Sequence, residues 1–252
     1  MSESKPNPVN ATSIADPRWK DLYQIGGICA ILMAVITVLG FVIYFIWPYQ
    51  PGLKTPTDIF SAIQTNAFAG LMSLDFIMVV VTFISIPFFI ALYVSTKQAN
   101  ESYALIALVF GLISCILIFI MRPIAEMFSL SNQYAAATTD VARNQYLAAG
   151  QALSALFNGT GWILYFLTYT VEYLITSLLM LRINAFSKTA AYLGIILSIG
   201  VLSPLAVIIP SLAPIFTILN LATTLIWTLW LVLVARTLFR LAKNASTASQ
   251  TA

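Results

Sequence analysis

Residues 160–182 read TGWILYFLTYTVEYLITSLLMLR, a run that is long and apolar enough to cross a lipid bilayer. A helix rises about 1.5 Å per residue, so about 20 such residues span a hydrocarbon core of about 30 Å. Glu172 lies near the centre of this run, roughly 15 Å from its carboxyl end. An ionised side chain at that depth costs about 3 kcal/mol on insertion scales, so Glu172 needs a partner, a proton or a function.

The rest of the chain repeats this apolar pattern. The 252 residues are 60% hydrophobic and only 8% charged, with a mean hydropathy of +0.91. A soluble protein carries roughly 25% charged residues, so most of this surface must face lipid. Five further runs meet or approach the length of a crossing: 24–47, 68–95, 103–122, 188–209 and 213–236. The sequence therefore predicts an all-α polytopic membrane helix bundle with six transmembrane helices over 23–241. If residues 188–236 instead form one broken element, the bundle has five transmembrane helices.

Polar segments flank the predicted bundle and interrupt it. The two ends, 1–22 and 242–252, are predicted to be disordered cytoplasmic tails. Two loops, 57–66 and 138–157, place apolar residues at helical spacing. Both loops are predicted to form short amphipathic helices on the extracytoplasmic surface, either as a structural lid or as a gate for a substrate.

Lysine and arginine set the orientation of the predicted bundle, because cytoplasmic loops carry an excess of both. With an even number of spans, nine lie on the side of the termini: Lys5, Arg18, Lys20, Lys97, Arg182, Lys188, Arg236, Arg240 and Lys243. Three lie on the other side: Lys54, Arg122 and Arg143. We therefore expect a multi-pass protein of the plasma membrane with both termini in the cytoplasm.

Four polar residues of the run 160–182 form one stripe. Tyr165, Tyr169, Glu172 and Thr176 follow one another at i, i+4, i+7 and i+11, which places them on one helical face. In hydrocarbon such a face must meet other helices or a water-filled cleft, and a Glu172 without a partner is expected to be neutral. We interpret the stripe either as structural glue between helices or as a ligand or proton site.

Asp75, Arg122 and Glu126 form a second candidate group, an ion cluster. Counting along the spans places Arg122 and Asp75 at similar depths, roughly 28 and 30 Å from the cytoplasmic ends. Glu126 would lie one turn beyond Arg122 if the helix continued past Pro123, although this proline is expected to kink or end the span. We therefore expect Arg122 to pair with Asp75 or Glu126. Pairing with Glu172 is the alternative, and it requires Arg122 to stretch deep into the bundle.

The sequence lacks the residues and motifs that several kinds of catalytic or binding site require. The chain has no histidine, and HExxH, GxSxG, Walker and dinucleotide-binding motifs are missing from the sequence. Cys29 and Cys115 lie inside apolar runs without CxxC spacing. No basic stripe suggests a nucleic-acid partner. We therefore expect no catalytic residues, no cofactor and no metal.

The stretch 145–240 resembles an uncharacterised bacterial six-span family known only as a domain of unknown function. The resemblance rests on three segments: QYLAAGQALSALF at 145–157, LLMLRINAFSKTAAYLGIILSIGVL at 178–202 and WTLWLVLVARTLFR at 227–240. It implies the fold and the membrane location, and it brings no activity and no functional residues.

The leading functional prediction is a non-enzymatic integral membrane protein, an accessory or interaction component of the plasma membrane. Its expected partners are the lipid bilayer and other membrane proteins. The alternative is a small transporter or ligand-binding membrane protein with a central polar cavity around Glu172, whose small-molecule ligand stays unassigned. An intramembrane enzyme ranks third.

Overall fold

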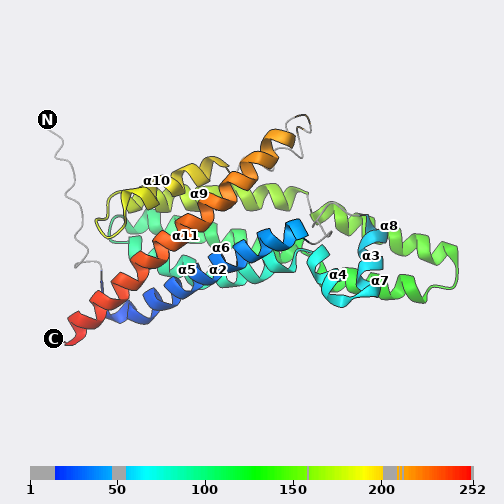
Figure 1. Ribbon diagram of the computed structural model, residues 1–252, viewed down its shortest axis with the longest axis horizontal. Coiled ribbons are helices and arrows are strands. Elements are labelled where there is room, and N and C mark those ends of the chain that lie inside the picture. Colours follow the sequence, from blue (N-terminus) through cyan, green and yellow to red (C-terminus); the bar gives the residue numbers. More distant parts are fainter. Residues whose placement is uncertain are drawn as a thin grey trace. The chain divides into compact units, whose positions relative to one another are not determined.

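The computed structural model describes residues 15–46, 55–157, 159–200, 209, 211 and 213–250, and these residues form an all-helical structure without β-strands (Figure 1). The elements are η1 (Pro17–Trp19), α2 (Lys20–Ile46), α3 (Pro56–Thr65), α4 (Ala67–Ser73), α5 (Phe76–Thr96), α6 (Glu101–Met121), α7 (Ile124–Ala136), α8 (Asp140–Phe157), α9 (Thr160–Met180), α10 (Lys188–Gly200) and α11 (Ala213–Gln250).

Among the described residues, five helical segments are long and apolar enough to cross a membrane. They are Pro17–Gly40, Phe76–Thr96, Glu101–Ala136, Asp140–Met180 and Leu221–Ala248. A further apolar helix, Lys188–Ile199, is shorter. The predicted all-α fold is therefore confirmed, and the long apolar helices are of the kind that a membrane protein needs. Most of the second half of the predicted fifth span, 201–208, lies outside the described residues.

The chain divides into two compact units, which we describe separately. Unit 1 comprises Met1–Val35, Ile84–Ile113 and Leu167–Ala252. Unit 2 comprises Ile36–Phe83 and Ser114–Phe166. Helices α2, α5, α6 and α9 each contribute residues to both units.

Glycines bring the helices of unit 1 close together. A Cβ atom on Gly26 of α2 would overlap the methyl group of Ala91 on α5, and one on Gly27 would lie 2.8 Å from the ring of Phe239 on α11. Small residues of this kind allow close helix contacts in lipid. Large side chains fill the remaining interior, and the largest fully buried ones in unit 1 are Tyr23, Met33, Phe88, Phe89, Leu92, Tyr173 and Trp230.

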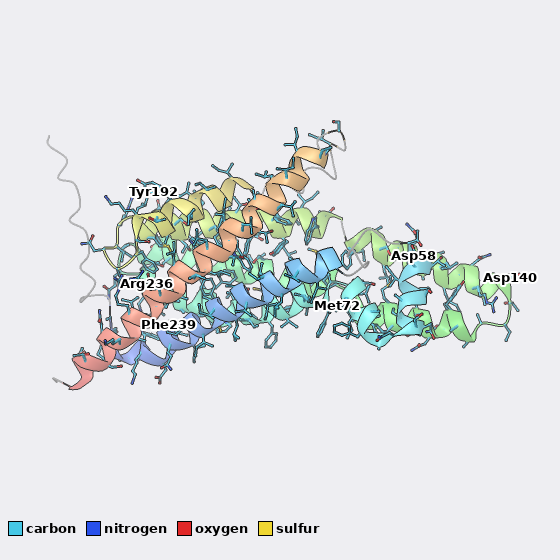
Figure 2. All side chains as sticks on the ribbon, in the orientation of Figure 1. Asp58, Met72, Asp140, Tyr192, Arg236 and Phe239 are labelled. Carbon is cyan, nitrogen blue, oxygen red and sulfur yellow. The ribbon has the colours of Figure 1, made fainter. Side chains whose placement is uncertain are left out.

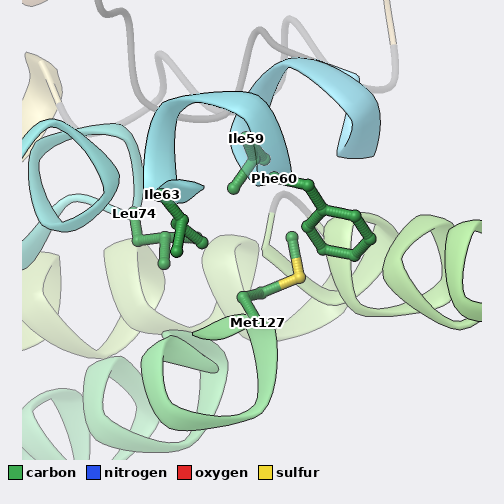
Figure 3. Packing of buried hydrophobic residues seen from close by; sticks show 5 residues of the cluster. All are labelled: Ile59, Phe60, Ile63, Leu74 and Met127. Atoms are coloured by element: carbon green, nitrogen blue, oxygen red, sulfur yellow. The ribbon is translucent and has the colours of Figure 1, made fainter. Parts of the chain in front are cut away.

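Short helices form a compact group in unit 2. Helix α3 packs against α4, α7 and α8, and α7 packs against α8. Their buried core consists of Ile59, Phe60, Ile63, Leu74 and Met127 (Figure 3). A Cβ atom on Gly150 of α8 would lie 2.9 Å from Cζ of Phe60, so this glycine allows α8 to approach α3. Thr55 and Asp58 form a reciprocal capping box that starts α3.

The predicted loop helices 57–66 and 138–157 correspond to α3 and α8, but other boundaries differ from the predictions. The predicted span 68–95 is two helices, because Asp75 has a φ of 59° that no right-handed helix continues. Pro123 follows the end of α6, as expected, and a new helix, α7, starts at Ile124. The sequence pattern did not predict α7.

Both predicted tails contain ordered structure. The C-terminal tail 242–252 is helical up to Gln250, which corrects the prediction of disorder. The physical reason is burial: Leu241, Ala242 and Ala245 continue the apolar face of α11 and lie in the interior of unit 1. At the other end, η1 and the first turn of α2 fall within 1–22, whereas 1–14 lies outside the described residues.

Candidate functional site

Glu172 lies on the part of α9 that belongs to unit 1, and only 1% of its surface is exposed. The Thr176 hydroxyl group, one turn further along the same helix, donates a hydrogen bond of 2.9 Å to Oε1. The other oxygen, Oε2, is buried and has no hydrogen-bond partner among the described residues. The carboxyl group is therefore only half satisfied, and its one hydrogen bond among the described residues stays within α9.

Gly111 on α6 makes room for this carboxyl group. A Cβ atom at Gly111 would lie 3.2 Å from Cγ of Glu172 and 3.0 Å from the ring of Phe89 on α5. Helices α5, α6 and α9 thus enclose Glu172 with apolar surface. A buried acceptor without a partner costs about 1–3 kcal/mol of stability, so we expect the unpaired Oε2 atom of Glu172 to lower the stability of unit 1.

Aromatic side chains surround the same part of α9. The Tyr169 and Tyr173 hydroxyl groups share a hydrogen bond, and Nε1 of Trp227 on α11 donates to the Tyr173 hydroxyl group. The Tyr169 ring lies 6.1 Å from the Phe89 ring, and the Tyr173 ring lies 4.8 Å from the Trp230 ring, both edge to face. The hydrogen-bonded pair of tyrosines is therefore joined to Trp227 of α11, with the Tyr169 ring packed on α5 and the Tyr173 ring packed on α11.

Two more buried polar atoms lie next to this aromatic group. Oγ of Ser177 and Nε1 of Trp230 have no hydrogen-bond partner among the described residues. Both flank Gly194 of α10: a Cβ atom there would overlap Ser177 and lie 2.9 Å from Nε1 of Trp230. This part of unit 1 thus gathers a hydroxyl group, an indole N–H and a carboxyl oxygen that lack described partners.

The structure separates the predicted stripe into different environments. Glu172 and Thr176 bond to each other, whereas Tyr169 bonds to Tyr173. Tyr165 falls in unit 2, where its ring stacks on Trp162 at 5.7 Å. The helical stripe did not include Tyr173, which adjoins Glu172 in the chain. The sequence pattern also did not point to Trp227, whose position in an aromatic-rich last span was the only available signal.

Arg122 is the buried centre of the predicted ion cluster, in unit 2. Its Nε and Nη2 atoms donate to Oδ2 of Asp75 at 3.1 and 2.8 Å, and Nη1 donates to the Phe157 carbonyl oxygen at 3.2 Å. The guanidinium carbon lies 3.9 Å from the centre of the Phe157 ring and 4.7 Å from that of Trp162. The structure therefore joins Arg122 to Asp75 and stacks it on two aromatic rings.

Three helix breaks of unit 2 meet at this guanidinium group. Asp75 lies in the turn between α4 and α5, Arg122 between α6 and α7, and Phe157 at the end of α8 before α9 begins. Glu126 is exposed on α7 and forms no ion pair within the described part of the chain, which corrects its place in the predicted cluster. The cause is Pro123: α7 starts anew after it, so helical spacing from Arg122 does not reach Glu126.

Comparison with known proteins identifies the family to which the chain is similar. A family described as "Domain of unknown function (DUF4386)" matches residues 25–235. No curated protein and no solved structure matches the chain. Within the described residues, no group of three or more His, Cys, Asp or Glu side chains is placed to hold a metal ion.

Proposed function

Because the chain belongs to the DUF4386 family of unknown function, we propose a function from its own site. The protein is a non-enzymatic, multi-pass protein of the plasma membrane that binds a small organic cation at Glu172 in exchange for a proton. This proposal takes the transporter or ligand-binding alternative of the sequence analysis. An accessory role among other membrane proteins stays a prediction.

One observation carries the choice: Glu172 forms no described hydrogen bond to another helix. A residue that glues helices together gains stability from bonds between them. Glu172 instead leaves one carboxyl oxygen without a described partner and lowers stability by about 1–3 kcal/mol. An intramembrane ionisable residue that costs stability is most simply explained by a function.

The surrounding side chains favour a cationic ligand. In its neutral form, Glu172 avoids the cost of a charge in an apolar interior. An arriving organic cation would release that proton to water and pair with the resulting carboxylate. The nearby Tyr169, Tyr173 and Trp227 rings would add cation–π attraction to a cation held there. The site is neutral in both states, because the carboxylate of Glu172 is neutralised by a proton before binding and by the organic cation after it.

The proposed topology has six crossings with both termini in the cytoplasm. In unit 1, η1 packs against α11, so the first and last described elements meet. Nζ of Lys97, in the turn between α5 and α6, lies 5.0 Å from the centre of the Trp19 ring of η1. The end of unit 1 that holds η1 therefore also holds a loop cation, which supports a cytoplasmic location. Helices α3 and α8 then face the extracytoplasmic side.

Calorimetry of the full chain in detergent tests the exchange, with tetraphenylphosphonium as the probe. Titrations in two buffers of different ionisation enthalpy count the protons released. We expect the wild type to release about one proton per bound cation between pH 7 and 8. Glu172→Gln is expected to release none and to bind about tenfold more weakly.

Glu126→Gln is the matched control, because it makes the same chemical change at an exposed site on α7. It is expected to bind and release protons like the wild type. The proposal is overturned if tetraphenylphosphonium does not bind, if binding releases no proton, or if Glu172→Gln and Glu126→Gln behave alike.

A further inference from the structure

The turn between α9 and α10 is ordered and anchored in unit 1. Three of its side chains are buried: Ile183, Ala185 and Phe186. The Ser187 hydroxyl group accepts a hydrogen bond of 3.1 Å from the Ala190 N–H at the start of α10. Arg182 and Lys188 are exposed on either side of the buried residues. Packing therefore fixes the positions of two cations at this end of unit 1.

Helix α11 brings further cations to the same turn. Nη2 of Arg240 donates to the Ala185 carbonyl oxygen, which ties α11 to the turn. Arg236, labelled in Figure 2, lies one turn earlier on α11 and is exposed. Lys243, about one turn after Arg240, is also exposed. We call these five residues the basic patch: Arg182, Lys188, Arg236, Arg240 and Lys243.

The basic patch has little acid to neutralise it. The sequence from 173 to 252 contains no Asp or Glu, and no patch residue forms an ion pair within the described part of the chain. The described acidic residues of unit 1 are Asp16, Asp21, Glu101 and Glu172. Of these, Asp16 is paired with Arg18 at 2.8 Å, and Glu172 is buried.

The depth of the basic patch matches that of lipid headgroups. No charged residue occurs between Lys188 and Arg236 in the sequence, so these two are the first charges at the ends of two apolar helices. Such residues lie at the membrane interface. Tyr192, one turn into α10 and 56% exposed, is a typical interfacial side chain (Figure 2). Helix α11 has 38 residues, about 57 Å, so its end must leave a core of about 30 Å.

From this charge and depth, we propose that the basic patch binds the phosphate groups of anionic phospholipids. Exposed cations at headgroup level complement these lipids in charge, and an ordered turn presents them together. The proposal does not depend on Glu172 or on the identity of any solute.

Native mass spectrometry of the detergent-purified chain tests this proposal. The chain is titrated with dioleoylphosphatidylglycerol or with dioleoylphosphatidylcholine, and the first bound lipid is counted. We expect phosphatidylglycerol to bind more tightly, and Arg236→Gln to weaken it about 5-fold. The triple variant R182Q/K188Q/R236Q is expected to weaken it about 100-fold. Arg240 is retained because it anchors the turn.

Arg143→Gln is the matched control, since it removes one exposed cation from α8, outside the basic patch. It is expected to bind both lipids like the wild type. The proposal is overturned if both lipids bind equally or if Arg143→Gln weakens binding as much as Arg236→Gln. It is also overturned if millimolar inorganic phosphate displaces the lipid, because the site would then bind free phosphate.

Discussion

Glu172 is held by a single hydrogen bond from its own helix. We predict that Glu172→Leu raises the melting temperature in detergent, because it removes a buried oxygen without a partner and relieves about 1–3 kcal/mol. Glu172→Gln is expected to lower the melting temperature, since its amide adds donors that also need partners. Circular dichroism melts check both. A lower melting temperature for Glu172→Leu would support structural glue instead.

Thr176 provides the control for this prediction. Its hydroxyl group donates to Glu172, so Thr176→Val is expected to cost about 1 kcal/mol in the wild type. In the Glu172→Leu background that partner is gone, so the same change is expected to be neutral or stabilising, because it removes a buried hydroxyl group that has lost its partner. Equal effects in both backgrounds would show that the bond does not contribute to stability.

Arg122 supports a different prediction, in unit 2. Arg122→Gln is expected to cost about 3–5 kcal/mol, because it leaves Asp75 without its cation and removes the bond to the Phe157 carbonyl group. Asp75→Asn is expected to cost about as much, because it leaves the charge of the Arg122 side chain, which is only 1% exposed, without its carboxylate. Thermal unfolding of both single variants and the double variant measures the coupling. If the two single-variant losses of stability simply add in the double variant, Arg122 and Asp75 are not coupled.

These residues show what sequence can predict about the sites. Counting residues along the spans placed Arg122 beside Asp75, because depth in a helix follows directly from residue number. The same count could not predict the Phe157 and Trp162 rings, which come from the junction of α8 and α9. The count reaches Glu126 only if the helix continues past Pro123, and α6 ends at Met121. Contacts across helices depend on tertiary packing, so local spacing does not reveal them.

At the scale of helices, Gly26 determines how closely α2 approaches α5. Its added Cβ atom would overlap the Ala91 methyl group, which cannot move aside. We predict that Gly26→Ala costs about 1–3 kcal/mol, because overpacking forces the helices apart. Ala91→Gly is expected to restore part of the loss in the double variant. Melting temperatures of the four proteins in this cycle check the prediction.

Gly40 is the control on the same helix. A Cβ atom there would lie 3.7 Å from Cγ2 of Ile77, an ordinary contact. Gly40→Ala is therefore expected to be neutral or stabilising, because alanine has the higher helix propensity. If Gly26→Ala and Gly40→Ala had the same effect, close approach to Ala91 would not be the cause.

The helices also show why some elements escaped prediction. Residues 124–136 have a mixed composition, and only tertiary contact reveals the buried face that includes Met127 and Ser131 of α7. The C-terminal segment looked polar, yet a few small and apolar residues suffice to hold it helical within unit 1. Long apolar runs, in contrast, predicted the five described segments that are long and apolar enough to cross a membrane, because hydrophobic length alone decides them.

At the scale of the whole molecule, the number of crossings decides on which side the chain ends. An even number returns the chain to the side where it began, and an odd number does not. Within unit 1, η1 packs against α11, so both described ends of the chain share one end of that unit. This contact favours six crossings over five, with α10 belonging to one of them.

Cysteine labelling from outside intact cells tests this topology. The native Cys29 and Cys115 are only 8% and 3% exposed, so the wild type is expected to remain unlabelled by an impermeant maleimide. Asp140→Cys, at a side chain that is 96% exposed, is expected to react, because α8 faces outward in the proposed topology. Lys20→Cys and Ala248→Cys, at exposed positions, are expected to react only after the cells are opened. Labelling of Ala248→Cys but not Lys20→Cys in intact cells would indicate an odd number of crossings. An odd number would place the two ends of the chain on opposite sides of the membrane. The short η1 could not then reach α11, so that result would contradict the contact between them.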